Sequence, residues 1–303
     1  MDEKADYLRA VTGKLQCFER GKKFMKIDLA GKAAVVTGGG GILAGCMAKG
    51  FARCGATVAI LDMRLELAKK RADEIKAAGG SAIAVECDVL NKKSMIAAEK
   101  KVYDELGNYH ILLNGAGGNR DNATITHERF CKEAADDPAI LSFFSLAIED
   151  FESTMDPNFM GTLIPTQVFL KRMVDVKGAS IINISSMTAF VPLTRSFAYG
   201  MGKTAINSLT QFLAMHFGNT GLRVNAIAPG FIATPMNRHM LIKEDGSFTD
   251  RGAKVVEHTP LARFADPEEL VGAALFLADE KYSGFITGVV LPVDGGFLAA
   301  PGV

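Results

Sequence analysis

The chain has 303 residues, and its 34 basic side chains balance its 34 acidic ones, so the formal net charge is zero. The chain therefore has no excess of basic residues that would favour nucleic acid or an anionic membrane as its main partner. With 48% hydrophobic and 22% charged residues, the composition is that of a globular chain with a large buried core, not of a disordered or fibrous one.

The sequence also shows no sign of a membrane segment, an export signal or a metal site. No apolar run approaches the length of a bilayer span, and the first residues lack the patterns of signal and transit peptides. The cysteines are odd in number without Cys-x-x-Cys spacing, and the histidines are scattered. These residues are Cys17, Cys46, Cys54, Cys87, Cys131, His110, His127, His216, His239 and His258. We expect a cytoplasmic protein with a small-molecule substrate, without a metal, and with neither a membrane nor a nucleic acid as partner.

From residue 33 onward, short apolar runs that predict strands alternate with longer segments that predict helices. The predicted strands span residues 33–37, 57–61, 81–87, 111–113, 179–185, 223–227 and 288–293. The predicted helices span residues 42–54, 64–78, 92–106, 151–174 and 197–217. Such alternation requires right-handed crossovers and a parallel sheet with helices on both faces. The sequence therefore predicts one doubly wound, Rossmann-type α/β domain over residues 31–303, with a parallel sheet of about seven strands.

Two segments depart from this alternation. Residues 1–30 carry charges of both signs among a few apolar positions, which predicts a peripheral N-terminal extension. Residues 119–150 interrupt the pattern, and the sequence Asp136-Asp137-Pro138 within them would break any helix. Because structureless connections longer than about 15 residues tend to be lids or disorder, and because this one is too apolar for a free linker, we predict a substrate-covering insertion that is mobile without ligand. The alternative is a static extra helix that enlarges the core.

A glycine run between the first predicted strand and the first predicted helix indicates a phosphate-binding turn. Residues 38–41 are four consecutive glycines, which would let the backbone approach a pyrophosphate seated on the following helix N-terminus. Asp62 ends the second strand, where a carboxylate accepts hydrogen bonds from the adenosine ribose and repels the 2′-phosphate of NADP. We therefore predict NAD as the cofactor, with Arg64 as a residue that could instead bind a phosphate.

The next two strand ends carry weaker candidates. Asp88 could accept a hydrogen bond from the adenine amino group, and residues 114–117, Asn-Gly-Ala-Gly, would bring a glycine-rich backbone close to the ribose. Either segment could also be an ordinary turn.

The residues that predict chemistry are a serine, a tyrosine and a lysine. Ser186 follows an isoleucine-rich buried strand, so its hydroxyl would emerge at the carboxyl edge of the sheet, where ligands of such folds bind. Tyr199 and Lys203 are four residues apart on a predicted helix and therefore share one face. A nearby ammonium should shift the Tyr199 pKa toward neutrality, which suits proton transfer to a carbonyl whose oxygen Ser186 holds. The pair alone could also be an exposed Tyr/Lys pair on a helix.

The motifs taken together resemble the short-chain dehydrogenase/reductase family over residues 28–298. They are Thr37-Gly38 with its glycine run, Asp62, Asp88, Asn114-Gly115-Ala116-Gly117, Asn158, Ser186, Tyr199-x-x-x-Lys203, Pro229-Gly230 and Val293-Asp294-Gly295-Gly296. The resemblance implies that Ser186, not Ser185, orients the substrate, that Asn158 anchors a water in a proton relay through Lys203, and that Lys203 also binds the nicotinamide ribose.

The resemblance also implies a set of cofactor contacts, which includes the segment from Pro229 to Thr234 beside the nicotinamide. The implied contacts are Gly38, Gly40, Gly41, Ile42, Asp62, Asp88, Val89, Asn114, Ala116, Gly117, Tyr199, Lys203, Pro229, Gly230, Ile232 and Thr234. Three positions depart from the family pattern. Ile42 and Ala44 stand where the family has its second and third loop glycines, which puts the usual loop geometry in doubt, and Gly115 replaces the commoner asparagine at the cost of one side-chain amide.

These departures and the insertion resemble a subgroup described as D-mannonate oxidoreductases or fructuronate reductases. That resemblance implies reduction of a sugar acid's keto group, and Asn119, Arg120 and Arg195 are candidate substrate residues, although solvated loop arginines are the simpler interpretation of the last two. A polyol or sugar dehydrogenase, a 3-oxoacyl reductase and a non-catalytic dinucleotide-sensing protein are the alternatives. Apolar residues around much of the helices at 151–174 and 197–217, together with the family resemblance, predict a homo-oligomer, in particular a tetramer.

Overall fold

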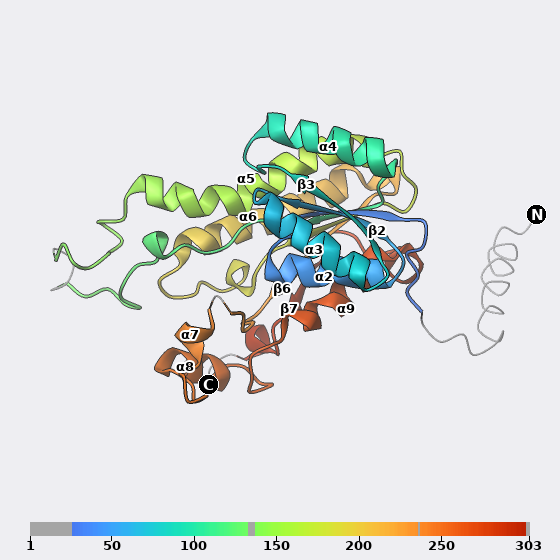
Figure 1. Cartoon of the computed structure of the whole chain (residues 1–303). Helices are drawn as coiled ribbons and strands as arrows, with labels where there is room; N and C mark the ends of the chain where they lie inside the picture. The colour runs from blue at the N-terminus through green and yellow to red at the C-terminus, as the bar shows by residue number, and fades with distance from the viewer. Residues whose placement is uncertain (1–25, 133–136, 236, 301–303) are drawn as a thin grey trace, which may run out of the picture.

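The computed structural model describes residues 26–132, 137–235 and 237–300 (Figure 1). The predicted N-terminal extension therefore lies outside the described residues up to residue 25, and so does the part of the predicted insertion at residues 133–136. The described chain enters the core early, because Leu29 is fully buried and its N–H donates to the Cys54 carbonyl at 2.8 Å.

Seven parallel strands form one sheet in the order β3-β2-β1-β4-β5-β6-β7, which confirms the predicted fold class. The strands are β1 (Ala33–Thr37), β2 (Thr57–Asp62), β3 (Ser81–Glu86), β4 (Ile111–Asn114), β5 (Ser180–Ile184), β6 (Arg223–Pro229) and β7 (Val290–Val293). The strand order reverses between β1 and β4, which pair side by side. Ligands of open parallel sheets bind outside the carboxyl ends of the strands at such a switch point.

Helices cover both faces of the sheet (Figure 1). They are α2 (Ile42–Arg53), α3 (Leu65–Ala77), α4 (Lys92–Leu106), α5 (Ile148–Met173), α6 (Phe197–His216), α7 (Arg238–Leu241), α8 (Asp250–Glu257), α9 (Val271–Ala278) and α10 (Glu280–Ser283), with short 3-10 turns such as η2 (Asp121–Ala123), η3 (Met187–Ala189) and η5 (Pro267–Leu270). The five predicted helices are present with ends shifted by at most three residues, and those after β6 were not predicted. The eight residues of α9 are nearly all apolar, so they lack the periodic pattern that reveals a helix.

The two faces of the sheet have separate cores, which follow from the alternation of side chains along each strand. In β1, Ala34 and Val36 pack toward α2, α3 and α9, whereas Ala33 and Val35 pack toward α4, α5 and α6. Both sets are buried. Because strands buried on both faces are apolar throughout, the first strand has the continuous hydrophobic run that predicted it.

The insertion between β4 and α5 extends away from the sheet as a loop (Figure 1). Its described residues contain η2 and the first residues of α5 as their helical parts, so they give no support to a static extra helix. The loop is tied to α6, because Phe143 lies 5.4 Å from Phe197 between ring centroids. Phe130, Phe143 and Phe144 remain mostly exposed.

Candidate active site

The structure brings Ser186, Tyr199 and Lys203 together beyond the carboxyl end of β5. The Ser186 hydroxyl lies close enough to the Tyr199 phenol to act on its pKa, which it lowers. The Lys203 ammonium is 5.5 Å from the centroid of the Tyr199 ring and donates to the Ile184 carbonyl at 2.7 Å. Because Tyr199 and Lys203 are four residues apart on α6, one helical turn aligns both side chains toward the strand end.

The two adjacent serines face different surroundings. The Ser185 hydroxyl bonds the Asn207 side chain at 2.5 Å and the Lys203 carbonyl at 3.4 Å, so it is occupied by α6. The Ser186 hydroxyl accepts from the Thr188 N–H at 3.2 Å and faces Tyr199. Ser186 is therefore the serine whose hydroxyl lies next to the candidate proton donor.

Burial governs the ionisation of this pair. It raises the Tyr199 pKa above its ordinary value, and the hydrogen bond with Ser186 acts in the opposite direction. Burial also lowers the Lys203 pKa from 10.5 to about 7, since the lysine is only 3% exposed. The prediction that the ammonium moves the Tyr199 pKa toward neutrality is thus wrong for the site in this structure, because desolvation disfavours the charged form of both groups.

Asn158 fastens the loop after β4 to the middle of α5. Its side-chain amide donates to the carbonyls of Thr154 at 2.7 Å and Gly118 at 2.8 Å, and its oxygen accepts from the Gly118 N–H at 3.1 Å. A Cβ on Gly117 would lie 2.6 Å from that oxygen, so only glycine allows this approach. The Asn158 carbonyl accepts from Thr162 at 3.0 Å. The predicted role of Asn158 in a water relay stays a prediction.

The glycine run forms a turn whose geometry requires small residues. Gly38 has a φ of +63°, and a Cβ there would approach Ala116 within 2.8 Å. A Cβ on Gly40 would lie 2.6 Å from Leu67. No side chain caps α2, whose N-cap is Gly41, so the first N–H groups of that helix are available to an anion.

Ala44 and Gly115, two of the departures from the family pattern, compensate each other. A Cβ on Gly115 would lie 2.6 Å from the Ala44 Cβ, so the methyl group of Ala44 occupies the space that a larger residue at 115 would need. The loss of one side-chain amide is therefore an incomplete account of Gly115. Glycine at 115 lets β4 and α2 approach although α2 carries alanine at 44.

Asp62 is buried at the end of β2 and holds the glycine turn. One carboxylate oxygen accepts from the Gly40 N–H at 3.2 Å, and the other accepts from the Arg64 N–H at 3.1 Å. The Arg64 guanidinium lies 4.0 Å from the same carboxylate and is mostly exposed. Asp62 ends β2, which lies two strands from β4 in the sheet, and β4 pairs with β5, the strand that precedes Ser186. The uncapped helix, the closely packed glycines and this carboxylate together fit a dinucleotide.

The other predicted cofactor residues lie along the same edge in varied settings. The Asp88 carboxylate accepts from the Leu90 N–H at 2.9 Å in an exposed position. This contact fits the alternative that Asp88 belongs to an ordinary turn. The buried Asn114 amide donates to Thr166 at 2.9 Å and Asn183 at 2.8 Å, so its side chain links β4 to α5 and β5. Val89 packs against Gly161 of α5.

The segment after β6 is held close to the strand end of β7. A Cβ on Gly230 would lie 2.6 Å from Asp294, which requires glycine there. The Ile232 carbonyl accepts from the Asn237 amide at 2.9 Å, and the Thr234 N–H donates to the Asn237 oxygen at 2.7 Å. Pro229 and Gly230 thus end β6 at the same sheet edge as Ser186.

The three predicted substrate residues lie in the loops beside the trio. The Asn119 amide donates to Thr124 at 3.0 Å and to Ser196 at 3.4 Å. Arg120 is exposed, and Arg195 has a φ of +77° and donates from Nε to the Ile125 carbonyl at 2.7 Å. Sequence reasoning missed Arg251 of α8, which lies near Arg195, because α8 itself was not predicted.

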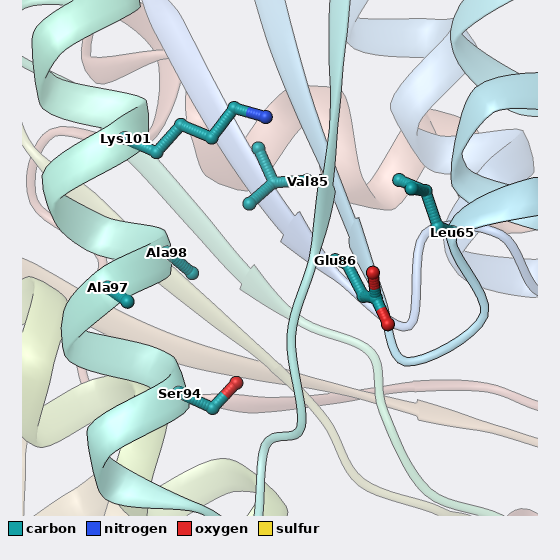
Figure 2. Close-up of a pocket in the computed structure, with 7 residues that line it drawn as sticks. All are labelled: Leu65, Val85, Glu86, Ser94, Ala97, Ala98 and Lys101. Atoms are coloured by element: carbon teal, nitrogen blue, oxygen red, sulfur yellow. The ribbon is translucent and has the colours of Figure 1, made fainter.

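A separate hollow of about 270 Å³ lies at the sheet edge between α3, β3 and α4 (Figure 2). Its lining residues are Leu65, Val85, Glu86, Ser94, Ala97, Ala98 and Lys101. β3 is four strands from β5 in the sheet, which at roughly 4.8 Å per strand is about 19 Å. The hollow is therefore distinct from the candidate active site.

In the described ranges 26–132, 137–235 and 237–300, no helix is both long and apolar enough to cross a bilayer. In the same ranges, no group of three His, Cys, Asp or Glu side chains is arranged as a metal site requires.

Comparison with known proteins gives consistent matches over most of the chain. A family model described as enoyl-(acyl carrier protein) reductase matches residues 41–298. UxuB, an uncharacterized oxidoreductase of Bacillus subtilis, is 46% identical over 276 residues, which are 91% of this chain and 98% of that protein.

Two solved structures extend the comparison to cofactors. A proposed D-mannonate oxidoreductase from Haemophilus influenzae with bound NAD has a TM-score of 0.87 at 44% identity, covering 91% of this chain and 98% of that one. A proposed NAD(P)-dependent gluconate 5-dehydrogenase from Beutenbergia cavernae, with NADP bound at low occupancy, has a TM-score of 0.76 at 29% identity, covering 91% of this chain and 100% of that one. The matched folds therefore include a protein with NAD and one with NADP.

Proposed function

Because the chain belongs to the short-chain dehydrogenase/reductase family and is an oxidoreductase of alcohol and keto groups, we propose that it uses NAD(H) to interconvert a keto group and a secondary alcohol of a sugar acid, of the D-fructuronate/D-mannonate type. The observation that carries the reaction class is the convergence of Ser186, Tyr199 and Lys203 beside an uncapped helix N-terminus on one sheet edge. The similarity to the Haemophilus influenzae protein supports the substrate class.

In this proposal the side chains position and protonate the substrate. The nicotinamide supplies the hydride during reduction and accepts it during oxidation. The Ser186 hydroxyl holds the carbonyl oxygen, and the Tyr199 phenol donates its proton to that oxygen as the alcohol forms. Burial favours a protonated Tyr199, which is the form that a proton donor needs. Lys203, held by the Ile184 carbonyl, is placed to contact the nicotinamide ribose and to assist proton return.

Preference for NAD over NADP rests on Asp62. Its carboxylate closes β2 and faces the glycine turn, where it would accept from the ribose hydroxyls and repel a 2′-phosphate. The residues that would hold the dinucleotide are Gly38, Gly40, Gly41, Ile42, Asp62, Asp88, Val89, Asn114, Ala116, Gly117, Pro229, Gly230, Ile232 and Thr234.

The proposal extends to assembly and location. A groove of about 440 Å³ with an apolar lining runs between α5 and α6. Phe212 and Met215 are 52% and 74% exposed on α6, an unusual exposure for apolar side chains that supports burial against a second copy in a homotetramer. Free thiols at Cys46, Cys54 and Cys87 fit a reducing cytoplasm.

The test is a purified-enzyme screen that follows NADH absorbance with fructuronate, tagaturonate, 5-ketogluconate and simple polyols, repeated with NADPH. We expect the highest kcat/KM for a keto sugar acid with NADH. Turnover confined to polyols would establish the polyol dehydrogenase alternative, and a preference for NADPH would refute the role of Asp62.

A further inference from the structure

A half-buried guanidinium without a partner among the described residues lies near Arg195, in the loop that leads into the Tyr199 helix. Arg251 is the second residue of α8, and among the described residues it makes no hydrogen bond and no ion pair within 4 Å. Half-buried charges are normally paired because loss of hydration is costly. An unpaired arginine in this position therefore favours an anionic ligand.

Arg195 supplies a second cation close to Arg251. It precedes α6 by two residues and lies four positions before Tyr199 in the chain, which limits the distance between those two Cα atoms to about 14 Å. Its backbone carbonyl accepts from the Ile125 N–H at 3.0 Å while its Nε donates to the Ile125 carbonyl at 2.7 Å. The left-handed φ of +77° is unfavourable for arginine, so the surrounding loop holds this backbone conformation, and the bond from Nε fixes the side chain. Its two terminal Nη groups carry no hydrogen bond among the described residues.

An ion pair joins the insertion to α8 at this point. Glu128 of the insertion accepts from Lys254 of α8 at 3.2 Å. Lys254 follows Arg251 by three residues and so lies on the same face of α8. The stretch from Ile125 to Glu128 thus contacts Arg195 at one end and α8 at the other. Burial lowers the Arg251 pKa, the Arg195 charge lowers it further and the Glu128 charge raises it, so the three groups lie close enough to interact.

The charges of this cluster do not balance. Arg195, Arg251 and Lys254 carry three positive charges, and Glu128, paired with Lys254, carries the negative charge that acts on Arg251 among the described residues. We propose that Arg251 and Arg195 bind the carboxylate of the substrate from two sides of the site, with Arg251 setting the preference for sugar acids over neutral sugars. Planar guanidinium groups suit this role because they donate two parallel hydrogen bonds to a carboxylate. The proposal rests on the proposed function, which places a sugar acid at Tyr199.

The test measures binding without turnover. D-mannonate and D-gluconate, and in parallel D-mannitol and D-glucitol, are titrated into the enzyme–NADH complex while NADH fluorescence is followed. Each acid differs from its polyol by one carboxylate in place of a hydroxymethyl group. The variants are Arg251→Gln and Arg251→Lys. The matched control is Arg129→Gln, which removes one positive charge from an exposed position next to Glu128.

We expect Arg251→Gln to raise the Kd for the acids at least about 10-fold, with an intermediate value for Arg251→Lys, because charge-assisted hydrogen bonds are lost. The Kd values for polyols and NADH, and all values for Arg129→Gln, should stay within about twofold. Unchanged acid binding in Arg251→Gln, or an equal loss in Arg129→Gln, overturns the role of Arg251. Wild-type enzyme that binds polyols and neither acid refutes the proposed substrate class instead.

Discussion

The buried ammonium of Lys203 should make the protein less stable at low pH, and Lys203→Met should remove that dependence. The folded-state pKa is about 7 and the ordinary value is 10.5. Between these values the unfolded chain binds one more proton than the folded chain, so stability rises with pH. The stability that depends on a neutral Lys203 is fully present above pH 10.5 and is lost as the pH falls through 7.

The magnitude follows from the shift. Each pH unit between the two pKa values changes the free energy of unfolding by about 1.4 kcal/mol. From pH 6 to pH 9, wild-type protein should therefore gain about 2.7 kcal/mol from Lys203, most of it between pH 7 and 9. Methionine keeps the length of the side chain but cannot ionise. It also loses the hydrogen bond to the Ile184 carbonyl, which costs about 1 kcal/mol at every pH and cancels from the comparison.

The assay is urea denaturation of wild type and Lys203→Met at pH 6 and pH 9, at one protein concentration and without cofactor. The difference in free energy of unfolding between the two proteins should change by about 2 to 3 kcal/mol between the two pH values, in favour of the variant at pH 6. Lys93→Met, at an exposed position on α4, should show no such change. A difference that stays constant within about 1 kcal/mol would refute a neutral-range pKa for Lys203.

The remaining predictions concern turnover, cofactor choice, assembly and the insertion. Tyr199→Phe should lower kcat by at least about 100-fold and leave the Kd for NADH unchanged, because it removes a proton donor and little contact surface; near-normal kcat would exclude the proposed mechanism. Asp62→Ala should weaken NADH binding and reduce discrimination against NADPH, both measured by fluorescence titration, whereas unchanged preference would assign that choice to Arg64 or the glycine turn. Met215→Glu should shift the sedimentation coefficient toward smaller species by placing a charge on an apolar contact, and a wild-type active monomer would contradict the homotetramer. NADH with a sugar acid should protect residues 119–150 from limited proteolysis, and equal cleavage rates with and without ligand would argue against a lid.

The sequence alone determined the fold, because its signals are local. Strands such as β1 and β2 are buried on both faces and therefore read as continuous apolar runs, and the amphipathic helices α3 and α4 show their period directly. The trio was also visible, since Tyr199 and Lys203 share a helix face by spacing and Ser186 ends a strand. Glycines and strand-end residues marked the sheet edge in the same way.

Only the tertiary structure decided what depends on residues distant in the chain. Ala44 and Gly115 compensate each other through contact between α2 and the end of β4, which neither local pattern reveals. The neighbours of Arg251 lie more than 50 positions away in the chain, so they are known only from the packing of α8. The sequence does not distinguish such an arginine from one on an exposed helix. The ionisation of Tyr199 and Lys203 was misjudged for the same reason, since spacing shows which charges are close but burial, which dominates both pKa values, is a property of the whole fold.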